Sequence, residues 1–184
     1  EKIYIAILII SALILMPYFN PILPPKTLEN YLSSIGLSMQ IESNKKEIIP
    51  QWIGDRLGWE DIVKNVAEAY HKLPDNEKKD AAILSNNYSI SGAIDLMGEQ
   101  YGIPKSIGTH NNYWLWGYGN WNGNVLLAVR FPKKDLQSSF ETVEEVAKFD
   151  CYEAPSYMKN IRIYKAKNLK APIDVLWKEA YIFR

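Results

Sequence analysis

The sequence comprises 184 residues, of which 47% are hydrophobic, enough for one domain with a sizeable core and a short appendage. Its 21 basic residues balance 21 acidic ones, and no basic run interleaves with aromatic residues, so nucleic acid is not an expected partner. The single cysteine, Cys151, excludes a disulfide within the chain and a multi-cysteine zinc site.

An uncharged apolar run opens the chain, from Ile3 to Met16. Because a bilayer core needs roughly 20 apolar residues as helix, we expect residues 1–17 to be the end of a transmembrane helix that starts upstream of Glu1. A signal peptide and a buried core helix remain alternatives. Lys2 precedes the run and the next lysine is Lys26, which favours placing the following part outside the cytoplasm.

Residues 18–50 are predicted to form a proline-rich linker with one short helix. Pro24 and Pro25 act as a stiff spacer, after which Thr27 is the expected helix cap and Gly36 the expected stop. Residues 38–50 are polar and mixed, which predicts a loop.

Residues 51–184 alternate between helical and strand periods, which predicts one soluble α/β domain. We expect a single layered domain with a mostly parallel or mixed sheet flanked by helices. Its expected strands are 81–84, 106–109, 125–131, 143–149 and 161–167, and its expected helices are 58–73, 90–101, 133–140 and one from Pro172. The segment 143–149 also fits a helical period, so a helix there stays open.

The polar turn after the strand at 81–84 is the first candidate ligand site. Open α/β sheets bind ligands at the carboxyl ends of strands, and helix amino ends attract anions. The candidate residues there are Asn86, Asn87, Tyr88 and Ser91. Asn and Ser are also the ordinary residues of turns and helix caps, so capping alone is the alternative.

An aromatic segment, residues 108–121, is the second candidate. Aromatic faces beside amide side chains offer apolar surface and hydrogen bonds together, as a sugar or a membrane interface requires. The candidate residues there are His110, Asn111, Asn112, Tyr113, Trp114 and Trp116. The alternative is a long loop that packs its tryptophans onto the core.

Catalytic, metal and cofactor sites are not expected. Ser91, His110 and Asp95 supply the residue types of a nucleophilic triad, but the turn lacks a nucleophile elbow. The two histidines, His71 and His110, are far apart in sequence, and the glycine patterns of nucleotide-binding loops are missing.

Several segments together resemble the carboxyl-terminal region of glycosyltransferase family 39 proteins, which are similar to dolichyl-phosphate-mannose protein mannosyltransferases and lipid A aminoarabinose transferases. The resemblance covers nearly the whole chain in order. Its main segments are Pro50–Trp59, Asn87–Tyr88 with Gly92–Asp95, Tyr101–Pro104 and His110–Gly117. Members of the family often carry a Glu where this sequence has Ile90, so any role of that carboxylate is missing here.

The resemblance implies a multi-spanning membrane enzyme that moves a sugar from a polyprenyl phosphate to a lipid or protein acceptor outside the cytoplasm. The family's catalytic acidic residues lie upstream of this chain, so no catalytic residue is assigned here. We therefore expect a non-catalytic extracytoplasmic domain of a membrane glycosyltransferase, whose partners are the membrane, the rest of its polypeptide and a sugar or lipid acceptor. The alternative is a membrane-tethered carbohydrate-binding or sensor module.

Overall fold

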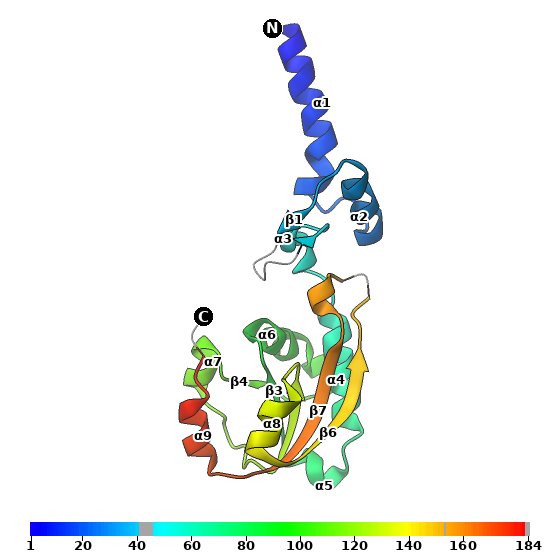
Figure 1. Cartoon of the computed structure of the whole chain (residues 1–184). Helices are drawn as coiled ribbons and strands as arrows, with labels where there is room; N and C mark the ends of the chain where they lie inside the picture. Colours follow the sequence, from blue (N-terminus) through cyan, green and yellow to red (C-terminus); the bar gives the residue numbers. More distant parts are fainter. Residues whose placement is uncertain (41–45, 153, 183–184) are drawn as a thin grey trace. The chain divides into compact units, whose positions relative to one another are not determined.

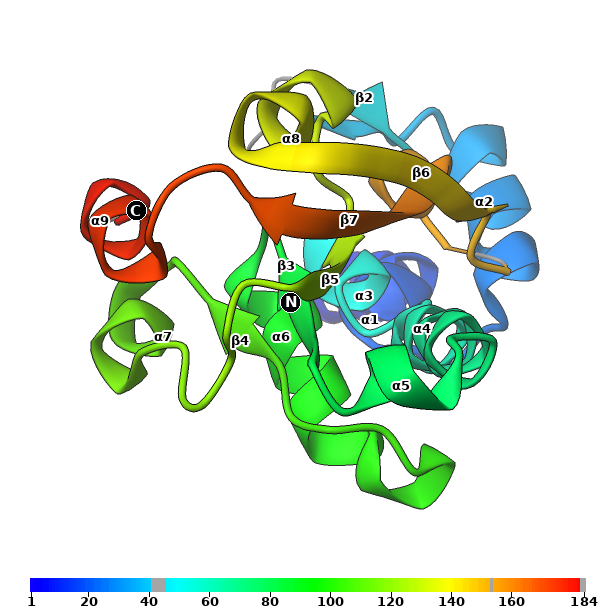
Figure 2. The ribbon, with the colours of Figure 1, turned by 90° about the horizontal axis from the view of Figure 1, so that it is seen from below.

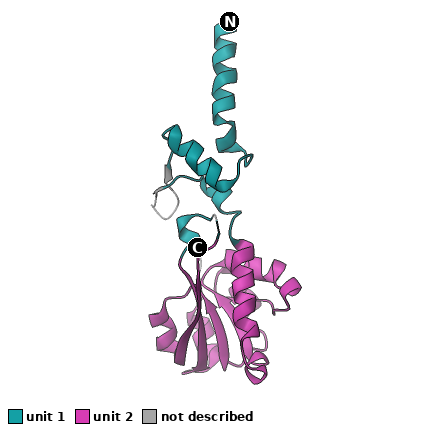
Figure 3. Cartoon of the chain, turned by 90° about the vertical axis from the view of Figure 1, so that its right-hand side faces the viewer, with its two compact units in different colours: residues 1–58, 152–159 teal, residues 59–151, 160–184 magenta. Residues whose placement is uncertain are grey.

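The computed structural model describes residues 1–40, 46–152 and 154–182 (Figure 1). The chain forms two compact units, coloured separately in Figure 3. Unit 1 consists of residues 1–58 and 152–159, and unit 2 of residues 59–151 and 160–184. Residues 152–159 therefore belong to unit 1 although they lie between two strands of unit 2 in the sequence.

Unit 1 begins with the apolar helix α1 (Lys2–Phe19), none of whose residues is buried. Its 18 residues have a mean hydropathy of 2.1, so α1 is long and apolar enough to cross a membrane by length and composition. A helix in the core of a soluble protein would be largely buried, and the exposure of α1 argues against that alternative.

The short helix α2 (Pro25–Ser34) follows after a proline-containing turn. The prediction that Thr27 caps this helix is wrong, because Pro24 occupies the capping position and Pro25 begins the helix. Proline suits the first helical position, since its fixed φ is already helical and the missing N–H would have no partner there. Gly36 ends the helix with a φ of +72°, as expected.

The segment predicted as a loop, 38–50, contains a short antiparallel strand pair instead. Strand β1 (Met39–Gln40) pairs with β2 (Lys46–Glu47), with Met39 opposite Glu47. Residues 41–45 of the predicted loop lie outside the described residues. A polar composition does not exclude two-residue strands, and Ile49 in this segment is buried.

A small hydrophobic cluster holds unit 1 together. Its buried members are Leu28 and Leu32 from α2, with Ile49 and with Ile53 of α3 (Gln51–Gly54). Tyr18, at the end of α1, packs against this cluster, and its ring lies 5.3 Å from that of Trp52.

The segment 152–159, with the short helix η2 (Ser156–Met158), joins unit 1 through close contacts. The Tyr157 hydroxyl donates to Asp55 Oδ1 at 2.6 Å, and the Ser156 hydroxyl donates to Glu47. A Cβ at Gly54 would lie 2.6 Å from Pro155 Cγ, so only glycine permits this approach.

Unit 2 is built on a five-stranded mixed sheet in the order β4-β3-β5-β7-β6. Strands β4, β3 and β5 are parallel, whereas β7 runs antiparallel to β5 and to β6. The strands are β3 (Ala81–Ser85), β4 (Ile107–Gly108), β5 (Val125–Val129), β6 (Phe140–Phe149) and β7 (Ile161–Leu169).

Helices cover both faces of this sheet, as Figure 2 shows end-on. One face contacts α4 (Trp59–His71) and α6 (Tyr88–Met97), and the other contacts α8 (Lys133–Ser139). All five residues of β5 are buried, as expected for a strand covered on both sides. The remaining helices are α5 (Asp75–Lys78), η1 (Glu99–Tyr101), α7 (Asn111–Trp116) and α9 (Ile173–Glu179).

The predicted α/β class with a mixed sheet and flanking helices is confirmed. The segment 143–149, for which a helix stayed open, is part of the long strand β6.

A charged cluster ties α5 to the antiparallel part of the sheet. The Glu77 carboxylate is largely buried and lies 2.7 Å from Lys167 Nζ and 3.5 Å from Lys165 Nζ. The Lys167 hydrogen bond, together with attraction to Lys165, outweighs burial and lowers the pKa of Glu77 below its usual 4.5.

We expect the Glu77 cluster to make stability pH-dependent. A lowered pKa contributes stability above the unfolded-state value near 4.5, and this contribution is lost as the pH falls through the folded-state value. Glu77→Gln should lower the unfolding free energy at neutral pH by about 1–3 kcal/mol and flatten its decline in acid. Urea denaturation at several pH values measures both effects.

The matched control is Glu68→Gln, because Glu68 on α4 lies 4.0 Å from Lys72, just after the end of that helix, in a well exposed pair. Such an exposed ion pair should contribute little to the unfolding free energy. An acid dependence that is the same in wild type and Glu77→Gln would contradict the role of the cluster.

Candidate functional site

The carboxyl ends of three parallel strands meet at one edge of the unit 2 sheet. Ser85 at the end of β3 is aligned with Gly108 of β4 and with Val129 of β5. The residues that follow these strands therefore come together at this edge. They include both candidate segments, and this is where open α/β sheets commonly bind ligands.

The turn after β3 caps helix α6. The Asn87 side chain accepts hydrogen bonds from Ser89 N at 2.7 Å and Ile90 N at 3.4 Å. Capping therefore accounts for Asn87. Tyr88 is about half exposed, at 52%. The buried Asn86 Oδ1 has no hydrogen-bond partner among the described residues.

Ser91 is not placed to act as a nucleophile. It is 1% exposed, and its hydroxyl lies 2.8 Å from the Ser85 hydroxyl. Asp95, the acid of the conceivable triad, accepts hydrogen bonds from Ser106 and from Tyr113. The arrangement is that of a structural network between α6 and the segment before β4.

The part of the chain that the structure describes holds no group of three His, Cys, Asp or Glu residues arranged to bind a metal ion. His71 Nε2 lies 2.7 Å from the Tyr101 carbonyl oxygen, which links α4 to the end of η1.

The aromatic segment forms the short helix α7, and its large side chains point in two directions. Trp114 points inward: its indole N–H donates to the Trp177 carbonyl at 2.7 Å, and Trp177 donates back to the Trp114 carbonyl at 3.2 Å. Leu115 and Trp116 point outward, with exposed fractions of 70% and 69%. The segment is therefore partly packed and partly exposed.

The start of α7 also contacts the end of the chain. Asn111 N donates to the Ile182 carbonyl at 3.0 Å, and Ile182 N donates to the Thr109 carbonyl at 2.9 Å. His110 is buried and forms an isolated parallel bridge with Ile182, whereas Asn112 is exposed. These contacts pair the C-terminal segment with the outer edge of the sheet beside β4.

Tyr113 joins the two candidate segments. Its hydroxyl donates to Asp95 Oδ2 on α6 at 2.9 Å, and its ring packs against that of Trp116 with centroids 4.8 Å apart. Burial, together with the hydrogen bond to the Asp95 carboxylate and its charge, raises the pKa of Tyr113 to about 12. The phenol therefore stays protonated and keeps donating across the physiological pH range.

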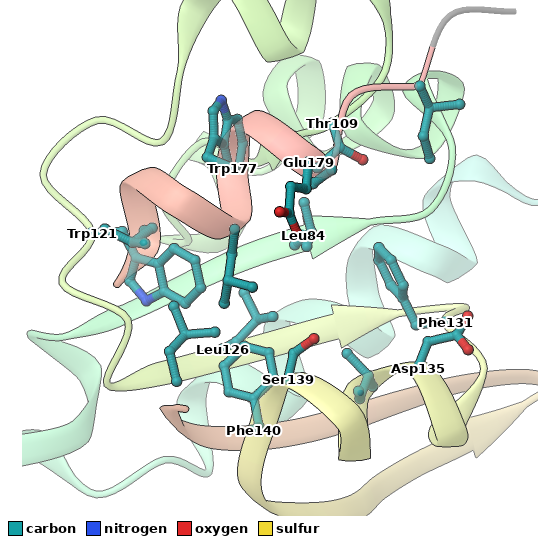
Figure 4. A pocket seen from close by; sticks show the side chains of 16 residues that line it. Leu84, Thr109, Trp121, Leu126, Phe131, Asp135, Ser139, Phe140, Trp177 and Glu179 are labelled. Carbon is teal, nitrogen blue, oxygen red and sulfur yellow. The ribbon is translucent and has the colours of Figure 1, made fainter. Parts of the chain in front are cut away.

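A cavity of about 340 Å³ lies beside this edge, between the sheet and helices α8 and α9 (Figure 4). Leu84 and Leu126 form its floor on the sheet, and Phe140 and Trp177 line it from opposite sides. Its volume falls within the range of roughly 300–1,000 Å³ that small-molecule pockets occupy.

The sequence did not reveal this cavity. Its lining residues extend from Leu84 to Ile182 and form no local motif. Only the order of the strands and the return of the chain to β4 bring them together. The partial signals were the apolar residues of the last helix and the tryptophans of the aromatic segment.

We expect Asp95→Asn to lower the Tyr113 pKa from about 12, because the variant removes the carboxylate charge. Burial, the larger cause, should hold the pKa above 10. Phenolate absorbance during an alkaline titration measures this, with Tyr113→Phe identifying the signal among the 12 tyrosines. An unchanged titration in Asp95→Asn would contradict the contact.

We also expect the two tryptophans of α7 to respond differently to truncation. Trp114→Ala should destabilise the protein by about 2 kcal/mol or more, since it removes a packed ring and its hydrogen bond to Trp177. Trp116→Ala should change stability by no more than about 0.5 kcal/mol, because the ring is exposed. Urea denaturation compares the unfolding free energies of the two variants. Equal losses would contradict a packed Trp114 beside an exposed Trp116.

Comparison of the chain with protein-family models, curated proteins and solved structures yields no match. The proposal of a function therefore depends on the geometry of the described residues and on the resemblance in sequence.

Proposed function

We propose that this chain is a non-catalytic, membrane-anchored part of a glycosyltransferase that uses a polyprenyl-phosphate-linked sugar donor, with α1 in the membrane and the part of the chain after α1 on the extracytoplasmic side. The exposure of α1, an apolar helix without a buried residue, is the observation that supports a membrane anchor. Such a surface is unfavourable in water and suits a bilayer.

The arrangement of unit 2 supports a role in binding. Ser91 is buried within a hydrogen-bonded network, and Asp95 is engaged by Ser106 and Tyr113. Exposed aromatic and aliphatic side chains occur at α6 and α7, among them Tyr88, Leu115 and Trp116. Such side chains can contact a sugar ring or a lipid chain of an acceptor.

The two aromatic positions are proposed to contact the acceptor. In the full-length enzyme, Tyr88→Ala and Trp116→Ala should each reduce sugar transfer while leaving the stability of the protein unchanged. The matched control is Tyr152→Ala, because Tyr152 is 77% exposed but belongs to unit 1. Equal transfer by all three variants would contradict the proposed contact.

The membrane anchor is tested by removing residues 1–16. The deletion stops before Tyr18 because that ring packs against the cluster of unit 1. The shortened chain should leave the membrane fraction and remain folded. Retention in the membrane fraction, or loss of folding, would contradict an anchor that lies outside the protein core.

Cysteine labelling can measure on which side of the membrane unit 2 lies. The single cysteine, Cys151, is buried, so a cysteine introduced at an exposed site such as Lys105 should label first. A membrane-impermeant maleimide added to intact cells should label Lys105→Cys. Labelling only after cell lysis would place unit 2 in the cytoplasm and contradict the proposal.

The full-length reading frame separates this proposal from a membrane-tethered carbohydrate-binding or sensor module. Many hydrophobic spans with an acidic early loop are expected for the transferase, and a single anchor for the module. The present chain alone should not turn over a polyprenyl-phosphate sugar.

A further inference from the structure

The cavity between the sheet, α8 and α9 has a mainly apolar lining that also includes two carboxylates. Its floor and walls are formed mainly by aliphatic and aromatic side chains, including Leu84, Leu126 and Phe140. Two lining residues are acidic and exposed, namely Asp135 on α8 and Glu179 on α9. Among the described residues, no Lys, Arg or His lines the cavity.

The two carboxylates have no ion-pair partner within the described part of the chain. Asp135 lies in the first turn of α8, where a negative charge is favourable. Glu179 is the last residue of α9, where the helix dipole disfavours a negative charge. Lys178, in the same last turn, is the one basic residue of α9 and already offsets part of that cost.

The walls of the cavity are held in place by contacts described above. The Trp114–Trp177 hydrogen bonds and the pairing of Ile182 with Thr109 fix α9 at its distance from the sheet. On the sheet side, Trp121 donates its indole N–H to the Val125 carbonyl at 2.8 Å. A cavity with fixed walls does not simply close to bury its apolar lining.

We propose that this cavity binds a small amphipathic organic cation, with its apolar body on Leu84 and Leu126 and its protonated amine drawn by the carboxylates among the lining residues, Asp135 and Glu179. Burial of the body against apolar side chains supplies affinity, and the unpaired carboxylates select a positive head group. This inference does not depend on the proposed transferase function.

The test uses the full chain in lipid nanodiscs and three ring compounds of similar size. The probes are ring-fluorinated phenethylamine, which is cationic, phenethyl alcohol, which is neutral, and hydrocinnamate, which is anionic. Fluorine NMR of the amine measures direct binding, and displacement measures the other two. The amine should bind tightest and hydrocinnamate weakest.

Substitutions of the two acidic lining residues test recognition of charge. Asp135→Asn and Glu179→Gln should each weaken binding of the amine by about two- to fivefold and leave binding of the alcohol unchanged. Asp174→Asn is the matched control, because Asp174 is an exposed acid on α9 that does not line the cavity. Equal binding of amine and alcohol by the wild type would overturn the proposal.

Substitutions that fill the cavity test its location. Leu176→Trp should abolish binding of all three probes, and Ser139→Leu, a smaller change on the opposite wall, provides a second variant should the first misfold. Circular dichroism and thermal unfolding establish that each variant is folded. Amine binding that persists in a folded, filled variant would place the probe elsewhere, for example in the lipid, and would overturn the proposal.

Discussion

Burial of β5 on both faces is the constraint on which unit 2 depends. A five-residue strand without an exposed side chain requires a layer of helices on each side and a paired strand along each edge. β3 supplies the parallel neighbour and β7 the antiparallel one. The parallel pairing aligns Ser85 with Val129, and this alignment creates the edge at which α6, α7 and the cavity meet.

The fold class could be predicted from the sequence because the strongest signals were local. The uninterrupted apolar residues of 125–129 and the helical spacing of 59–71 each indicate one type of element and little else. Where signals were weak or depended on distant partners, prediction failed in detail. Thr27 had the chemistry of a cap, but Pro25 already fixed the start of that helix two residues earlier.

The candidate site likewise has features that local sequence predicts and contacts between distant residues that it does not. The capping role of Asn87 follows from its place before an apolar helix, and the structure shows that role. The partners of Trp114 and Tyr113 could not be predicted, since Trp177 and Asp95 lie 63 and 18 residues away in the sequence. The cavity depends entirely on such distant contacts.

The placement of residues 152–159 in unit 1 has a consequence for how the protein can be divided. Neither unit is encoded by one continuous stretch, because the chain passes between the units at 58/59, 151/152 and 159/160. A fragment that starts at Trp59 would therefore carry Pro155 and Tyr157 without Gly54 and Asp55, which they contact within unit 1. A boundary at 58/59 therefore cuts through unit 1 and does not separate two independent units.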